Sequence, residues 1–165
     1  IVGLEVARGD WCEAAKYVQE KVLGIILGRV DPGKAVEFVK EYITEIGFGI
    51  KEIEPFIIWK TITKPIEEYK VKAPHVEAAK KLVGKGWNLT YGDKVGYVIV
   101  KGSGKLYEKA IPYFMVEPEQ LDVDYYVENQ IIPVALRILE MFKITKQQLG
   151  SLKPAKAKRL SKFFS

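Results

Sequence analysis

The residues best suited to chemistry lie between Ile62 and Leu82, where cationic and aromatic side chains follow an apolar run and are punctuated by two prolines. From Lys60 to Lys85 the chain has seven lysines against three glutamates, a net charge of +4. Pro74 can open a helix, because a first-turn residue does not need its N–H group. A basic loop with an aromatic residue, ending at a helix N-terminus, is suited to binding phosphates. A solvated basic loop without a ligand is the alternative.

The candidate catalytic groups elsewhere are isolated. Tyr91-Gly92-Asp93 resembles half of a metal-binding polymerase element, but Lys94 follows, and two-metal phosphoryl transfer needs paired carboxylates. We interpret it as a hairpin turn, and the Asp122-x-Asp124 pair as a helix start where Asp124 is the cap. His75 and Cys12 are the only histidine and cysteine, which argues against a zinc site or a Cys/His nucleophile. The sequence therefore predicts no catalytic centre and no cofactor in this chain.

Length and composition favour a folded domain followed by a tail. The 165 residues are 48% hydrophobic, which is enough for a core, and no apolar run reaches the roughly 18 residues of a membrane span. We expect one domain over residues 1–144 and a flexible basic tail over 145–165. The lone cysteine and the absence of a signal peptide predict a cytoplasmic protein. The missing initiator methionine suggests a fragment, a processed chain or a subunit.

Positive charge is concentrated at the C-terminus. The chain carries a net charge of +5, but no acidic residue follows Glu140, and seven basic residues do. In a turn of helix, Leu160, Phe163 and Phe164 would project together as a hydrophobic plug. This pattern resembles the PCNA-interacting (PIP) box that docks on sliding clamps, with Ala157 in place of the usual Gln. The alternative is that Phe163 and Phe164 fold back onto the domain.

The hydrophobic patterns predict helices around a small sheet. Two helices, from Asp10 to Gly28 and from Asp31-Pro32 to Gly47, should form an antiparallel hairpin. A helix from Pro74 to about Lys85 has Val76, Ala79, Leu82 and Val83 on its apolar face. The expected strands are Phe56–Thr63, Val95–Lys101 and a return strand Tyr107–Phe114, and a long helix runs from Asp124 to about Phe142, kinked at Pro133.

Four motifs, in order along the chain, resemble segments of one protein family. Gly3 to Trp11 resembles its G-L-E-x-x-R-x-D-W start, and Ile62 to Leu82 resembles its I-T-[RK]-x-x-x-x-Y-K-x-x-x-P-H-V-x-x-A-K-x-L segment. Gly92 to Val100 is similar to its G-D-x-V-x-Y-V-I-V strand. Tyr125 to Pro133, which Asp124 precedes, is similar to the Y-Y-x-E-N-Q-x-x-P part of one of its helices. The family that these motifs resemble is that of the archaeal family B DNA polymerases, and in particular their C-terminal thumb. The terminal PIP-like box lies where such polymerases often carry one.

The resemblance implies an α+β, mostly helical thumb domain with a helical hairpin, a small antiparallel β-region and a long kinked C-terminal helix. It implies a part of a DNA-directed DNA polymerase, a nucleotidyltransferase of DNA replication, that grips primer–template duplex DNA and tethers the enzyme to the sliding clamp, PCNA. The palm, with its magnesium-binding carboxylates, would lie elsewhere, in cis or in a large subunit. The implied DNA-binding residues are Arg8, Thr63, Lys64, Tyr69, Lys70, His75 and Asn129, and the clamp-binding residues are Leu160, Phe163 and Phe164.

The sequence therefore supports two hypotheses of function. The first is a thumb that is not catalytic by itself. The second is a free-standing clamp-binding adaptor without polymerase activity, which the tail alone would support. A composition rich in Lys, Glu and Ile also predicts a hot-adapted source.

Overall fold

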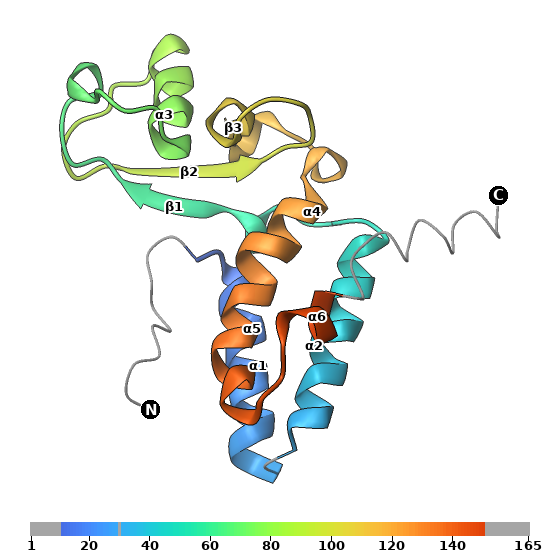
Figure 1. Cartoon of the computed structure of the whole chain (residues 1–165). Coiled ribbons are helices and arrows are strands. Elements are labelled where there is room, and N and C mark those ends of the chain that lie inside the picture. Colours follow the sequence, from blue (N-terminus) through green and yellow to red (C-terminus); the bar gives the residue numbers. More distant parts are fainter. Residues whose placement is uncertain (1–10, 30, 151–165) are drawn as a thin grey trace, which may run out of the picture. The chain divides into compact units, whose positions relative to one another are not determined.

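The computed structural model describes residues 11–29 and 31–150, and the described chain divides into two compact units. The helical unit consists of residues 13–50 and 123–150, and the sheet unit consists of residues 11–12 and 51–122. Figure 1 shows the helices of the first and the small sheet of the second. The predicted α+β, mostly helical fold class is confirmed.

The predicted helical hairpin forms the first part of the helical unit. It consists of α1 (Glu13–Arg29) and α2 (Pro32–Gly47), which pack against each other. Asp31 caps α2, because its Oδ1 accepts a hydrogen bond from the Lys34 amide at 3.2 Å. Pro32 occupies the first turn, where its missing N–H costs nothing. The local signals of cap and proline thus specify where α2 begins.

The C-terminal helix differs from the prediction in two details. The helical path consists of α4 (Val123–Tyr126), the π-helical η6 (Val127–Ile131), α5 (Ile132–Leu139) and the 3-10 turn η7 (Glu140–Phe142). It begins at Val123, so Asp124 lies within the first turn and is not the cap. We expected a kink at Pro133, and the structure shows a π-helical segment just before it. There the Ile132 amide donates to the Val127 carbonyl, five residues back.

The core of the helical unit forms where α1, α2 and α5 meet. Apolar side chains from all three helices are fully buried there, and Gln19 of α1 is buried among them with its Oε1 lacking a hydrogen-bond partner. The short helix α6 (Lys146–Gly150) contacts α5 and α2. The Thr145 amide donates to Gln148 Oε1 at 2.7 Å, and Leu149 is fully buried. Ordered structure therefore extends into the segment from residue 145 that we expected to be tail, because Leu149 adds to this core.

The sheet unit contains an antiparallel meander within residues 51–122. Its strands, in spatial order, are β1 (Ile58–Thr61), β2 (Lys94–Ile99) and β3 (Ala110–Pro112). Trp59 pairs with Gly96, and Val98 pairs with Ile111. All three strands are shorter than predicted. β1 begins only after the 3-10 turn η1 (Glu54–Phe56), and the expected return strand is reduced to β3 between η3 (Leu106–Lys109) and η4 (Tyr113–Met115).

Helix α3 (Pro74–Gly84) packs on β2 and β3 and begins at the predicted proline. Ala73 before it is extended, at φ −134° and ψ 154°, as a residue before proline should be. Lys81 Nζ donates to the Ala110 carbonyl at 3.1 Å and so links α3 to β3. The predicted apolar face is wrong at Val83, which is exposed, whereas Ala78 is buried with the remaining positions.

Candidate nucleic-acid interface

The loop between β1 and α3 is anchored by two buried isoleucines. The Ile62 amide donates to the Asp93 carbonyl at 2.7 Å, and the Gly92 amide donates to the Ile62 carbonyl at 2.8 Å. Ile66 is buried at the start of the 3-10 turn η2 (Ile66–Glu68). Thr63 and Lys64 lie between these anchors with exposed side chains. The apolar residues therefore fix the backbone, and the polar residues between them face outward.

Tyr69 joins three other predicted site residues into one cluster. Its hydroxyl accepts a hydrogen bond from the Thr63 amide at 2.9 Å and lies 3.3 Å from the Thr63 hydroxyl. The Lys64 ammonium lies 5.0 Å from the centre of the Tyr69 ring, within the range of a cation–π contact. The His75 ring packs edge-on against Tyr69, with the ring centres 5.8 Å apart. We call Thr63, Lys64, Tyr69 and His75 the Tyr69 cluster.

The surroundings in the Tyr69 cluster lower the pKa of both His75 and Tyr69. Burial lowers the pKa of His75 below its ordinary value of 6.5, and the charge of Lys60 lowers it further. Burial by itself raises the pKa of Tyr69, but hydrogen bonds from Thr63 and the backbone, together with the Lys64 charge, bring the net pKa below 10.0. At neutral pH the positive charge of the cluster therefore resides on Lys64.

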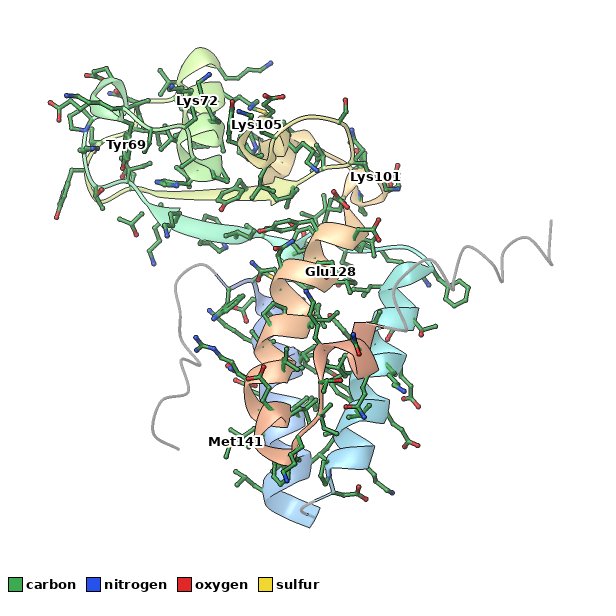
Figure 2. The ribbon with its side chains drawn as sticks, in the orientation of Figure 1. Tyr69, Lys72, Lys101, Lys105, Glu128 and Met141 are labelled. Atoms are coloured by element: carbon green, nitrogen blue, oxygen red, sulfur yellow. The ribbon has the colours of Figure 1, made fainter. Side chains whose placement is uncertain are left out.

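A second loop, residues 100–105 after β2, contains two glycines and lies next to the loop between β1 and α3, which we call the first loop. Lys72 lies with its ammonium 5.4 Å from the centre of the Tyr107 ring, which brings the start of α3 together with the segment after β2. Figure 2 labels Tyr69 and Lys72 from the first loop, and Lys101 and Lys105 from the second. All these lysines are exposed. The sequence analysis singled out the first loop only.

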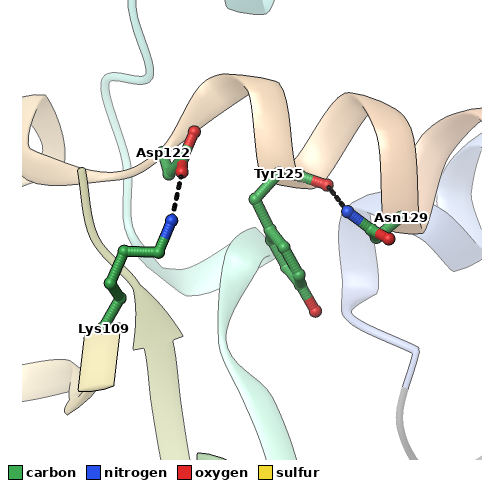
Figure 3. Close-up of polar contacts among 4 residues, drawn as sticks. All are labelled: Lys109, Asp122, Tyr125 and Asn129. Atoms are coloured by element: carbon green, nitrogen blue, oxygen red, sulfur yellow. Dashed lines mark hydrogen bonds and ion pairs between the residues drawn. The ribbon is translucent and has the colours of Figure 1, made fainter. Parts of the chain in front are cut away.

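Two features define the conformation of the second loop, a glycine within it and an ion pair after it. Gly104 has φ +111°, a conformation that favours glycine, and an added Cβ would overlap the Glu108 carboxylate. At the other end, Lys109 Nζ forms an ion pair of 3.2 Å with Asp122 Oδ2, and both side chains are mostly buried (Figure 3). The loop is therefore a defined structure that displays Lys105 two residues before Tyr107, the ring that Lys72 contacts.

The remaining predicted residues are not part of the Tyr69 cluster. Lys70 follows Tyr69 directly and is exposed, but no contact joins it to the other members. Asn129 belongs to the helical unit, where its Nδ2 donates to the Tyr125 carbonyl at 3.2 Å (Figure 3). Arg8, Leu160, Phe163 and Phe164 lie outside the described residues.

Residues 11–29 and 31–150 contain neither a cluster of metal-ligating side chains nor a helix that could span a membrane. No cluster of three or more His, Cys, Asp or Glu residues in this part of the chain could hold a metal ion. None of the described helices is long and apolar enough to cross a membrane.

Comparison with known proteins places this architecture in a family. The model of DNA polymerase family B matches residues 1–142. The chain belongs to DNA polymerase family B. It is 44% identical over 149 residues to DNA polymerase 2 of Aeropyrum pernix, covering 90% of this chain and 19% of that relative. It is 41% identical over 181 aligned positions to the DNA polymerase of Archaeoglobus fulgidus, covering 100% of this chain and 23% of the relative.

A solved structure of the same family has the same fold. The family B DNA polymerase from the hyperthermophilic archaeon Pyrobaculum calidifontis superimposes with a TM-score of 0.73 and 43% identity, over 83% of this chain and 19% of that one. This family B chain thus spans about a fifth of the length of the relatives that it matches.

Proposed function

We propose that this chain is the thumb portion of a family B DNA-directed DNA polymerase and that it grips primer–template duplex DNA through the sugar–phosphate backbone. The observation that carries the proposal is the Tyr69 cluster, in which Lys64 is held over an aromatic ring by a hydrogen-bonded loop. Such a preorganised cation suits a phosphate, since less conformational freedom is lost on binding. Membership in a DNA polymerase family supports DNA as the polyanion.

Each predicted residue has a role in this proposal. Lys64 and Lys70 neutralise phosphates, with Arg8 as a further cation. Thr63, Tyr69, His75 and Asn129 hydrogen-bond the DNA backbone or position the loop. None of these roles reads a base, so binding is independent of sequence and sensitive to salt.

Nucleotide addition takes place elsewhere in this proposal. It requires carboxylates that hold magnesium ions, and the described residues contain no group of three or more His, Cys, Asp or Glu side chains that could hold a metal ion. The palm-containing remainder of the polymerase, in cis or as a large subunit, would supply both the carboxylates and the magnesium. The thumb contributes the position of the duplex, not a chemical step.

The test is the binding of this chain to a primer–template duplex, measured by fluorescence anisotropy across salt concentrations. Each phosphate contact contributes about −0.9 to the slope of log affinity against log salt. Lys64→Ala and Lys70→Ala should each reduce the steepness of this slope by about one unit. Lys34→Ala, an exposed lysine on α2 in the helical unit, is the matched control. Equal slopes for Lys64→Ala and the wild type would overturn the role of the Tyr69 cluster.

The tail supplies the second part of the proposal, a tether to the sliding clamp. Leu160, Phe163 and Phe164 have the spacing of a clamp-binding plug, and Ala157 in place of Gln should weaken it. Clamp binding that is lost in Phe163→Ala would support the tether. The same tail motif favours a second candidate function, a clamp-binding adaptor without polymerase activity. The adaptor would bind the clamp yet show no salt-sensitive binding to the duplex.

A further inference from the structure

Four aromatic rings of the sheet unit form a continuous, partly exposed row outside the Tyr69 cluster. The ring centres of Trp59 and Tyr113 are 5.6 Å apart, those of Tyr113 and Phe114 are 5.3 Å apart, and those of Phe114 and Trp87 are 5.4 Å apart. Trp59, Phe114 and Trp87 are 44%, 48% and 52% exposed. We call these four residues the aromatic row. Large rings left this exposed usually mark a binding surface.

The backbone beneath the aromatic row is shaped to hold it. Gly96 pairs with Trp59 across β1 and β2, and a Cβ on Gly96 would lie 2.8 Å from the Trp59 ring and 3.0 Å from the Tyr113 ring. The absence of a side chain therefore lets both rings lie directly on the strand. Trp87 and Phe114 are stacked, with 22° between the ring planes. The row is thus ordered before any ligand binds, which reduces the entropy lost on binding.

At one end, the aromatic row opens into a groove of about 530 Å³. Trp87, Val83 and Tyr91 line this groove, and Pro65 and Ile66 contribute to its wall. Its volume is within the range of about 300–1,000 Å³ that is typical of small-molecule sites. Pro65 directly follows Lys64 of the Tyr69 cluster. The wall of the groove therefore includes the residue that follows the Tyr69 cluster's lysine in the chain.

The charges near the aromatic row favour an anionic polymer. Lys85 lies two residues before Trp87 and is exposed. Lys94 is exposed on the same face of β2 as Gly96, because side chains two residues apart in a strand share a face. Lys80 also lines the groove, together with Glu67. Exposed aromatic rings that alternate with lysines are typical of surfaces on which the bases of single-stranded nucleic acid stack.

We propose that the aromatic row and its groove bind the bases of single-stranded DNA. This inference goes beyond the proposed grip on duplex DNA and rests on it only for the choice of DNA as the polymer. Stacking on exposed rings needs unpaired bases, because the faces of bases in a duplex are covered by their neighbours. The Tyr69 cluster and the aromatic row would therefore select different forms of DNA.

The experiment titrates the whole chain with a single-stranded oligo(dT) and with a duplex, and records tryptophan fluorescence together with anisotropy. Two of the three tryptophans, Trp59 and Trp87, lie in the row, so stacking of bases should quench the emission. An abasic sugar–phosphate oligomer of equal length carries the same charges without bases. It should bind about tenfold more weakly and leave the emission unquenched.

Substitutions of Trp87 test whether oligo(dT) binds at the aromatic row. Trp87→Ala should weaken oligo(dT) binding about tenfold, Trp87→Phe should retain most of it, and both should leave duplex affinity unchanged. Phe48→Ala removes a ring that is exposed in the helical unit and serves as the matched control. Circular dichroism checks that each variant is folded.

Equal binding of the abasic oligomer, or equal losses in Trp87→Ala and Phe48→Ala, would overturn the inference. Binding of oligo(dT) that depends on Trp87, without any duplex binding, would support the inference and reject the proposed function. Salt-sensitive duplex binding without quenching by oligo(dT) would support the proposed function and reject the inference.

Discussion

The substitution Tyr69→Phe removes the hydroxyl and keeps the ring. It therefore tests how the hydroxyl positions the loop without changing the charge of the loop. In Tyr69→Phe, the Thr63 amide loses an acceptor at 2.9 Å, while Lys64 keeps an aromatic ring about where it lies now, 5.0 Å from its ammonium. A net hydrogen bond contributes about 0.5–1.5 kcal/mol. This bond is exposed, so we expect the lower part of that range, about 0.5–1 kcal/mol. If this energy orders the loop for binding, the affinity for duplex DNA should fall about two- to fivefold.

The assay is fluorescence anisotropy with a primer–template duplex over a series of salt concentrations. Tyr69→Phe removes no cation, so its salt slope should equal that of the wild type, in contrast to Lys64→Ala. Tyr17→Phe removes a hydroxyl from an exposed ring in the helical unit, where the Lys21 ammonium lies 5.8 Å from the ring centre, and is the control. A flatter slope for Tyr69→Phe, or the same loss of affinity in both tyrosine variants, would refute the reasoning.

Three further predictions concern stability. Because the pKa of His75 is lowered by burial and by the charge of Lys60, the unfolded state binds more protons as the pH falls through 6.5, and the free energy of unfolding should decrease there. Urea unfolding at pH 7.5 and 5.5 should show a smaller decrease for His75→Gln, and an equal decrease would contradict this origin. Gly96→Ala should cost about 1–3 kcal/mol, because its Cβ overlaps the Trp59 ring, and urea unfolding measures this. A loss well under 1 kcal/mol would mean that Trp59 moves aside freely. Asp31→Ala should cost about 1 kcal/mol in thermal unfolding and Asp31→Asn much less, since Asn can also cap, whereas equal losses would assign the effect to charge.

Local signals in the sequence predicted where the elements begin. Asp31 and Pro32 marked the start of α2, and Pro74 marked the start of α3, because capping and proline geometry act within one turn of the chain. The C-terminal helix was predicted less well. Pro133 was expected to produce a kink, whereas the helix changes to π-type hydrogen bonding just before it. Which of these accommodations occurs depends on the packing of the buried side chains around Ile131.

The candidate site was partly predictable for a similar reason. Thr63, Lys64 and Tyr69 lie within seven residues, so the loop that carries them could be recognised from its composition and motif. The hydrogen bond from the Thr63 amide to the Tyr69 hydroxyl depends on how Ile62 and Ile66 are anchored, and no sequence pattern indicates it. The contact of Lys72 with Tyr107 was not foreseen, because the two residues are distant in the chain.

The sequence by itself determined the family, the order of the elements and the chemical character of the basic loop, since motifs, caps and charges are local properties. Only the tertiary structure decided which distant side chains meet. Trp59, Trp87 and Phe114 come from three separate segments, and the aromatic row exists because β1 pairs with β2, β2 with β3, and Gly96 leaves room above the sheet. Contacts of that kind depend on strand register and packing, which are set when the whole sheet unit folds.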